Sequence, residues 1–193
     1  MVMTLMSNPK ASVATIIVAA DGTGDTTDIQ TGINLLPATG GCVYIKEGTY
    51  TITNTIDITS DNVSLIGCGR STQIQTTSNI RMLYCRQTAI APVGGILIEN
   101  LYFYGAGGGN AANVGIFMVA YNSFISHCWV ENCGAEGVYW GAVNANNILA
   151  NNYVLECIGS GIRCEGYSSL VFGNYCLENG DNGIDIRGND IKI

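Results

Sequence analysis

The sequence predicts an all-β protein, a right-handed parallel β-helix in which each coil of about 22–24 residues contributes three short strands. The first observation is a glycine followed by an apolar residue, recurring at intervals of 22, 24 and 22 residues at Gly115-Ile116, Gly137-Val138, Gly161-Ile162 and Gly183-Ile184. The second is that each unit holds three short runs with period-two alternation, separated by Asn, Gly and Ser. The units contain neither a helical stretch nor the leucine spacing of leucine-rich repeats, so this period favours a β-helix.

The composition is typical of a strand-rich chain with tight turns. Of 193 residues, 25 are Gly and 3 are Pro, while 47% are hydrophobic and 12% are charged. The formal net charge of -7 argues against nucleic acid as a partner, because phosphate binding needs a clustered basic face. No apolar run approaches the roughly 18 residues of a membrane-spanning helix, so no membrane partner is expected.

The N-terminal region predicts an entry segment followed by a short helix. Residues 1–18 are expected to form an N-terminal arm or a non-native start, with a signal peptide as the less favoured alternative, and residues 19–193 form the β-helix domain. The helix would cover the first coil of the solenoid. Its signals are a capping box, an apolar face and a terminating proline, formed by Thr27 and Gln30, by Ile29, Ile33 and Leu36, and by Pro37.

Stacked coils should place equivalent residues in columns about 4.8 Å apart. Three columns are predicted: an asparagine ladder at a tight turn (Asn100, Asn152 and Asn174, interrupted by Cys128), an aromatic column that fills the core (Trp129, Tyr153 and Tyr175), and a cysteine column (Cys133 and Cys157). The eight cysteines form no metal-binding pattern, which favours small core residues, with an extracellular disulfide framework as the alternative. The last coil shows no cap, so either the chain is a fragment or a second subunit covers that end.

Several segments carry a family resemblance: Asp21-Gly22, the "DIQTGIN" helix, "GGCVYIKEGTY" and "LIGCGRST", followed by "NNYVLECIGSGI" and "NYCLENGDNGI". Over most of residues 19–193 they resemble the pectate-lyase-like β-helix superfamily, and the opening is also similar to that of pectin methylesterases. The resemblance implies the fold and a role in carbohydrate chemistry, since the superfamily includes polysaccharide lyases, glycoside hydrolases, epimerases and tailspike depolymerases, as well as members that only bind. The catalytic segments of pectin methylesterases, polygalacturonases and alginate epimerases are absent, so no family catalytic residue is carried over.

The outward residues of the strand after each repeat glycine form the candidate substrate-binding surface. Alternation places Phe117, Tyr139, Arg163 and Asp185 in one outward column and Val119, Gly141, Glu165 and Arg187 in the next. In the functional interpretation Phe117, Tyr139, Arg163, Glu165, Asp185 and Arg187 bind a sugar chain, with the rings stacking on pyranose rings and arginine neutralising a uronate carboxylate. Arg163, Glu165 and Asp185 are the catalytic candidates. In the structural interpretation Arg163–Asp185 and Glu165–Arg187 are cross-strand salt bridges, each contributing a few tenths to about 1 kcal/mol.

Other polar residues give less defined signals. Glu156 and Glu178 share a column near the second turn with Asp181 close by, where a bound calcium would offset their repulsion and solvated turn residues are the alternative. No other cofactor is expected. His127, the only histidine, is predicted as a turn or edge residue. Residues 105–114 predict a long flexible insertion at the edge of a coil.

Two functions of different class fit these patterns. The first is a carbohydrate-active β-helix protein, or a portion of one, that acts on a polysaccharide as a lyase or glycoside hydrolase. The second is a non-catalytic solenoid, used for sugar binding or as a structural spike in a larger assembly. Both predict an extracellular or virion-associated protein with a polysaccharide or a further copy of the chain as partner.

Overall fold

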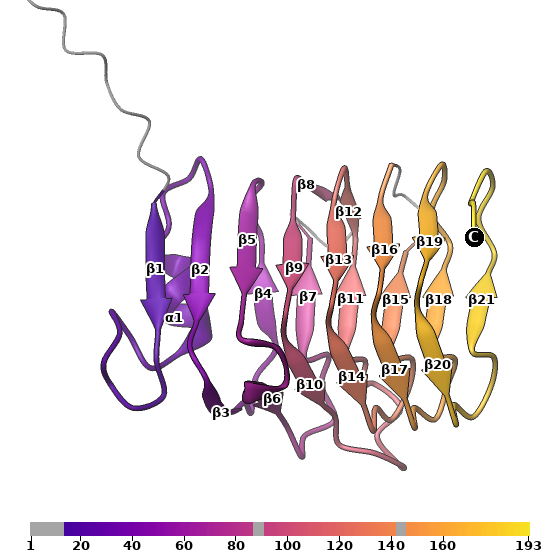
Figure 1. Ribbon diagram of the computed structural model, residues 1–193, viewed down its shortest axis with the longest axis horizontal. Coiled ribbons are helices and arrows are strands. Elements are labelled where there is room, and N and C mark those ends of the chain that lie inside the picture. The colour runs from indigo at the N-terminus through magenta and orange to yellow at the C-terminus, as the bar shows by residue number, and fades with distance from the viewer. Residues whose placement is uncertain (1–13, 87–90, 142–145) are drawn as a thin grey trace, which may run out of the picture.

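A computed structural model of the protein describes residues 14–86, 91–141 and 146–193. The chain winds as a right-handed parallel β-helix with three strands in each coil and very little helix, which confirms the predicted fold class. Figure 1 shows the coils side by side along the long axis, with the C-terminus at the end opposite to β1. Each coil crosses from the first sheet to the second and then to the third before the chain returns to the first.

Four sheets contain all the strands of the described residues, and the register is parallel throughout. The first sheet comprises β1 (Thr15–Val18), β2 (Gly41–Ile45), β5 (Val63–Ile66), β9 (Leu97–Glu99), β13 (Phe124–Ser126), β16 (Ile148–Ala150) and β19 (Leu170–Phe172). The second comprises β3 (Gly48–Thr51), β6 (Thr72–Gln75), β10 (Tyr102–Tyr104), β14 (Trp129–Glu131), β17 (Tyr153–Leu155) and β20 (Tyr175–Leu177).

The third sheet positions the candidate site. It comprises β4 (Ile56–Ile58), β7 (Leu83–Cys85), β11 (Ile116–Met118), β15 (Val138–Trp140), β18 (Ile162–Cys164) and β21 (Ile184–Ile186). A small fourth sheet joins β8 (Val93–Gly94) to β12 (Ala120–Tyr121).

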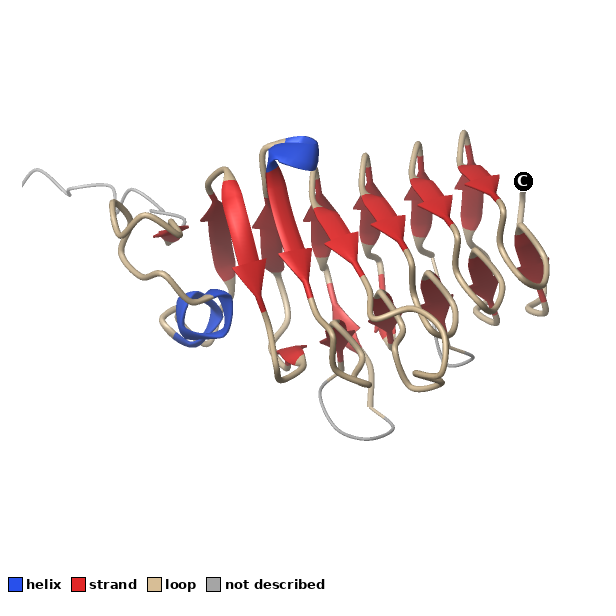
Figure 2. Cartoon of the chain, turned by 90° about the horizontal axis from the view of Figure 1, so that it is seen from below, coloured by secondary structure: helices blue, strands red, loops and turns tan. Residues whose placement is uncertain are grey.

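Helix α1 (Ile29–Asn34) lies at the N-terminal end of the solenoid, as Figure 2 shows, and the only other helical segment of the described residues is the single turn η1 (Gly69–Ser71). The side chain of Asp28 caps α1 by accepting from the backbone N–H of Thr31 at 2.7 Å, so the predicted cap at Thr27 is wrong by one residue. Ile29 and Ile33 are buried, as the apolar face predicts. Strand β1 lies within the segment predicted as an arm and pairs with β2. No helix of the described residues is long and apolar enough to cross a membrane.

The inner face of the third sheet is a continuous apolar column. The register stacks Ile116 on Val138 and Val138 on Ile162, and none of the three is exposed. Close packing explains why a glycine precedes these strands. A Cβ on Gly115 would lie 2.5 Å from Val130 Cγ1, and one on Gly137 would lie 2.2 Å from Val154 Cγ1, so only glycine lets the turn approach the core this closely.

The predicted aromatic column exists, but it faces outward. The rings of Trp129 and Tyr153 stack with centroids 4.5 Å apart, and Tyr175 follows at 5.7 Å, yet Tyr153 is 43% exposed and Tyr175 is 51% exposed. The prediction that these rings fill the core is therefore wrong. The core positions belong to Val130 and Val154 one residue later, because a slip of one residue turns every side chain of a strand to the other face.

The turn between the first and second sheets explains the slip. The first residue of this turn has a left-handed backbone conformation, with positive φ, in four successive coils, at Asn100, His127, Asn151 and Gly173. Asn100 therefore aligns with Asn151, not with Asn152 as predicted. The buried Asn152 lies one position later, where its Oδ1 accepts from Cys128 N at 2.9 Å and its own N–H donates to Asn174 Oδ1 at 3.0 Å. The amide column thus contains Asn152 and Asn174, and Cys128 replaces the amide in the coil before.

The cysteines are free thiols, and five of the eight are buried, which agrees with their interpretation as core residues. Burial raises the pKa of the Cys128 thiol to about 12. Residues 105–114 form an organised loop where a flexible one was predicted. The fully buried Asn113 accepts from Ala106 N at 2.7 Å and from Gly134 N at 3.1 Å, and it donates to Ile80 O at 2.9 Å. One amide side chain therefore connects three successive coils.

Candidate functional site

The outer face of the third sheet, hereafter the third-sheet face, brings the predicted site residues into two columns. The strand register aligns Phe117, Tyr139, Arg163 and Asp185 on successive coils, and it extends this column toward the N-terminus with Tyr84 and Asp57. The hydrogen bonds after each strand align a second column that contains Arg86, Val119, Gly141, Glu165 and Arg187. The predicted neighbours are thus placed as expected, whereas Val119 is buried.

Arg163 is the centre of an ion-pair cluster on this face. Its Nη1 donates to Glu136 Oε1 at 3.1 Å and its Nε donates to Glu165 Oε1 at 2.9 Å. The three side chains are only 19–25% exposed, so their charges are partly shielded from water. Burial acts to lower the pKa of Arg163, but the hydrogen bonds to Glu165 and Glu136 outweigh it and raise this pKa.

The predicted cross-strand salt bridges are not formed. Arg163 pairs with Glu165, two residues further along the chain, and with Glu136, from the loop before β15 in the preceding coil. Asp185 is its register neighbour but not its partner. Arg187 likewise pairs with Asp185 along the strand, at 2.8 Å. Side chains at i and i+2 lie on the same face of a strand about 6–7 Å apart, a span that an arginine reaches easily.

Tyr139 connects the cluster to the aromatic part of the face. Its hydroxyl donates to Glu165 Oε2 at 2.8 Å, and the guanidinium carbon of Arg163 lies 5.0 Å from its ring centroid. Both oxygens of Glu165 are therefore engaged. Burial, and then the hydrogen bond to Glu165, raise the pKa of Tyr139 above its usual value.

The N-terminal half of the face combines aromatic rings with two arginines. Tyr84, Phe117 and Tyr139 pack edge to face, with successive centroids 4.9 and 4.5 Å apart. The guanidinium carbon of Arg81 lies 4.8 Å from the ring of Tyr84 and 4.5 Å from that of Phe117, and that of Arg86 lies 4.2 Å from Tyr84. These ring faces are therefore partly covered by guanidinium groups, which limits stacking by a sugar.

Five residues of the face were missed from the sequence: Asp57, Tyr84, Arg81, Arg86 and Glu136. Tyr84 was hidden because the glycine that marks later strands is absent here, where Met82 precedes β7. A pattern of inward Leu83 and Cys85 around an outward tyrosine would have revealed it. Three of the others, Arg81, Arg86 and Glu136, lie outside the strands. Side chains in loops do not alternate regularly between two faces, so the sequence does not show which way they point.

A second group of similar composition lies on the second sheet. Arg70 lies over the rings of Trp129 and Tyr102, at 4.3 and 5.1 Å, and Tyr102 donates to Glu131 Oε2 at 2.9 Å. Burial, and then this hydrogen bond, raise the pKa of Tyr102 to about 12. The stacked rings of Trp129 and Tyr153 cover each other's faces and turn mainly their edges to solvent, so they form no flat platform for a sugar.

The predicted metal ligands are not gathered into a site. Glu156 and Glu178 do share a column, and both have left-handed backbone, with φ of 53° and 55°. Among residues 14–86, 91–141 and 146–193, however, no group of three or more His, Cys, Asp or Glu side chains has the geometry for a metal ion. His127 also has left-handed backbone, with its Nδ1 3.6 Å from Glu99 Oε1, so it occupies a turn as predicted.

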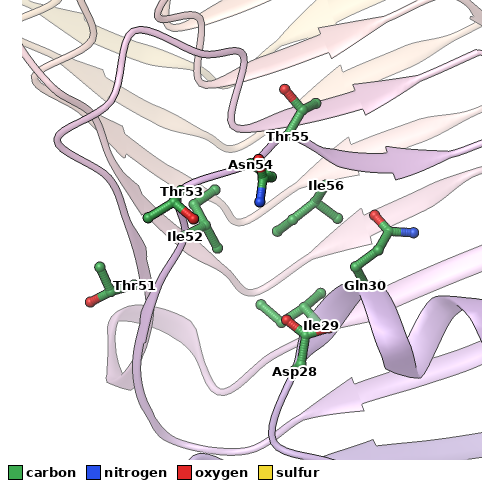
Figure 3. Close-up of a pocket in the computed structure, with 9 residues that line it drawn as sticks. All are labelled: Asp28, Ile29, Gln30, Thr51, Ile52, Thr53, Asn54, Thr55 and Ile56. Atoms are coloured by element: carbon green, nitrogen blue, oxygen red, sulfur yellow. The ribbon is translucent and has the colours of Figure 1, made fainter.

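A hollow of about 270 Å³ lies at the N-terminal end, between α1 and the connection from β3 to β4. Figure 3 shows the side chains of Ile29, Ile52 and Ile56 turned toward its centre, with polar groups from Asp28 and residues 53–55 around them. Gln30 joins the hollow to the third sheet, since its side chain accepts from Asp57 N at 2.7 Å and donates to Asp57 O at 3.1 Å.

Several solved structures share this fold. The catalytic domain of a GH87 α-1,3-glucanase, in complex with nigerose, matches 96% of this chain with a TM-score of 0.73 and 17% identity, and the Agl-KA catalytic domain matches 97% with 0.72 and 20%. Pectin methylesterase from carrot matches 83% with a TM-score of 0.59 and 20% identity, and ORF18 of Geobacillus virus E2 matches 86% with 0.52 and 18%. No protein-family model and no curated protein sequence matches this chain.

These likenesses show the fold alone, because the identities are 17–20%. This chain covers 33% of the GH87 glucanase structure, 36% of the Agl-KA structure, 42% of the viral protein and 53% of the carrot enzyme. The parallel β-helix expected from the superfamily resemblance is confirmed. An activity like that of any of these proteins can only be proposed for this chain.

Proposed function

We propose that this chain is the β-helix of a carbohydrate-active protein and that it binds a polysaccharide along the third-sheet face. The observation that supports this most is the arrangement of the Arg163 cluster. Glu136 and Glu165 are held by one guanidinium, and Tyr139 beside them extends the column of rings. Polar side chains that converge beside aromatic rings are the usual composition of a sugar-binding surface.

In this proposal Tyr139, Arg163 and Glu165 contact the sugar chain, and Phe117, Asp185 and Arg187 border it. Catalysis, as hydrolysis or elimination, would use the carboxylates of Glu165 and Asp185 and the guanidinium of Arg163, as expected from the sequence. Hydrolysis needs two carboxyl groups in acid and base or nucleophile roles. Glu136 joins the candidates because it shares Arg163 with Glu165.

The test is a polysaccharide panel with two readouts, ultraviolet absorbance of unsaturated products for elimination and reducing ends for hydrolysis. We expect one polysaccharide to bind, and we expect Glu165→Gln to reduce binding or turnover at least about tenfold, because a charge-assisted contact is lost. Glu47→Gln, on the connection between β2 and β3, is the control. If Glu165→Gln and Arg163→Gln both leave binding and turnover unchanged, the proposed site is wrong.

A non-catalytic solenoid for assembly is the second candidate, and a separate observation favours it. The outer positions of β13, β16 and β19 carry no charge, and Phe124, Leu170 and Phe172 are 43, 38 and 49% exposed. Exposed apolar rows of this kind often mark protein contacts. Under this proposal the chain would sediment as an oligomer and Phe172→Ser would dissociate it, whereas a monomer at all concentrations would contradict it. Either function would place the protein outside the cell or on a virion.

A further inference from the structure

Two arginines at the N-terminal half of the third-sheet face are held by aromatic rings. Arg81 lies over both Tyr84 and Phe117, and Arg86 lies over Tyr84. Strands β7 and β11 fix the rings, so the rings in turn restrict where the two guanidinium groups lie. A guanidinium stacked on a ring keeps its N–H groups at the rim of its plane, where they remain available to an acceptor.

No close acceptor in the described part of the chain uses these N–H groups. No carboxylate oxygen of the described residues lies within 4.0 Å of Arg81, and Arg86 Nε lies 4.0 Å from Asp57 Oδ1, which is beyond hydrogen-bonding distance. The group of Arg81, Arg86 and Asp57 carries a net charge of +1, in a chain whose net charge is -7. This group is therefore positive on a protein that is negative as a whole.

The other arginines of the third-sheet face already have carboxylate partners. Arg163 is hydrogen-bonded to Glu136 and Glu165, and Arg187 to Asp185, so their guanidinium groups already have carboxylate partners. The sequence assigned recognition of an acidic sugar to Arg163. The contacts argue for a different position, because a group of one arginine and two glutamates carries a net charge of -1 and would repel an anion.

We propose that Arg81 and Arg86 form an oxyanion subsite that takes the carboxylate or sulfate group of an acidic saccharide. The inference rests on the proposed function and specifies its substrate class. Guanidinium groups bind such oxyanions through paired N–H donors, and desolvation against rings strengthens the contact. A saccharide on the third-sheet face would place an anionic substituent over β7, while its neutral hydroxyls would meet the Arg163 cluster on β15 and β18.

The test is equilibrium binding of the full chain to three probes of matched length, namely oligogalacturonate, sulfated dextran and uncharged dextran. We expect an anionic probe to bind more tightly than uncharged dextran, and Arg81→Gln and Arg86→Gln each to weaken it about tenfold. The tighter of the two anionic probes identifies the substituent as carboxylate or sulfate. Arg70→Gln is the matched control, because Arg70 also lies over two rings, but on the second sheet. Circular dichroism verifies that each variant is folded.

Titration with inorganic sulfate separates this subsite from the proposed function. Loss of sulfate binding in Arg81→Gln, with no saccharide bound by any form, would support the subsite and contradict the polysaccharide. Equal binding of all three saccharides, sensitive to Arg163→Gln alone, would support the polysaccharide and overturn the subsite. Equal losses in Arg81→Gln and Arg70→Gln would show general charge attraction and would also overturn the subsite. Unchanged binding of anionic probes by Arg81→Gln and Arg86→Gln would overturn it as well.

Discussion

The two halves of the third-sheet face use the same residue types in opposite ways. In the N-terminal half, which β4, β7 and β11 form, the arginines beside β7 rest on rings and have no hydrogen-bonded carboxylate partner among the described residues. In the C-terminal half, on β15, β18 and β21, arginines donate to carboxylates at 2.9–3.1 Å. Beneath both halves the inner column is uniformly apolar. The backbone scaffold is therefore common to both, and the outward side chains alone determine what each half can bind.

The partners of an arginine therefore matter more to what it can bind than its position in a column. Arg163 seemed suited to a uronate when only register was considered, yet Glu136, from a loop, changes its charge environment. Conversely, Arg81 and Arg86 lie beside residues of a strand that carries no repeat glycine. In a solenoid each coil contacts only its neighbours, so such differences can persist a few coils apart without disturbing the fold.

The largest expected effect concerns the shared core. Trp140, 1% exposed beneath the C-terminal half, and Leu83, 0% exposed beneath the N-terminal half, are comparable sites. We expect Trp140→Ala to lower the free energy of unfolding by about 3–5 kcal/mol and Leu83→Ala by about 2–5 kcal/mol, since each leaves a cavity. Denaturant titration measures both values.

Hydrogen exchange then tests whether the halves are independent. We expect Trp140→Ala to reduce protection mainly on β15, β18 and their neighbouring strands, because contacts in a solenoid are local. Leu83→Ala should reduce it mainly on β4, β7 and β11. Uniform loss of protection across all coils in both variants would show that the molecule opens as one unit, and the distinction between the halves would then be limited to the surface.

The second effect separates the two kinds of arginine. Arg163→Ala leaves Glu136 and Glu165 without their cation, and these side chains are 19% and 20% exposed, so we expect a loss of about 1–3 kcal/mol. Among the described residues Arg81 contacts two rings and no carboxylate, so we expect Arg81→Ala to cost about 0.5–1 kcal/mol. Thermal unfolding of both variants in one buffer gives the comparison. A loss for Arg81→Ala equal to or greater than that for Arg163→Ala would show that Arg81 has a structural role.

The sequence predicted the scaffold better than the surface. The repeat glycines fixed the register of the third sheet, because Gly115 and Gly137 meet the core at distances that exclude a side chain. The second sheet lacks such a marker, and the turn of two residues that begins at His127 or Asn151 reversed the expected direction of Tyr153. Side-chain pairing could not be predicted, since alternation gives the face on which Arg163 lies but not which of several nearby carboxylates it contacts.

An effect smaller than that of Arg163→Ala depends on the hydroxyl of Tyr139, which connects the two halves. Tyr139→Phe removes its hydrogen bond to Glu165, and we expect a loss of about 1 kcal/mol at neutral pH. The raised pKa of Tyr139 means that the folded state favours the neutral phenol. Its contribution is complete below about pH 10, the ordinary value for tyrosine, and is lost as the pH rises through the folded pKa.

Stability of the wild type should therefore fall above about pH 10, and Tyr139→Phe should show a shallower fall. Tyr102→Phe, on the second sheet, should also flatten the curve, across the window from 10.0 to about 12. Melting temperatures at intervals through this alkaline range give both slopes. If Tyr139→Phe loses stability as steeply as the wild type above pH 10, the phenol is not held by Glu165. The carboxylate cluster and the aromatic column would then be independent of each other, and the division of the face into two halves would be sharper than the contacts indicate.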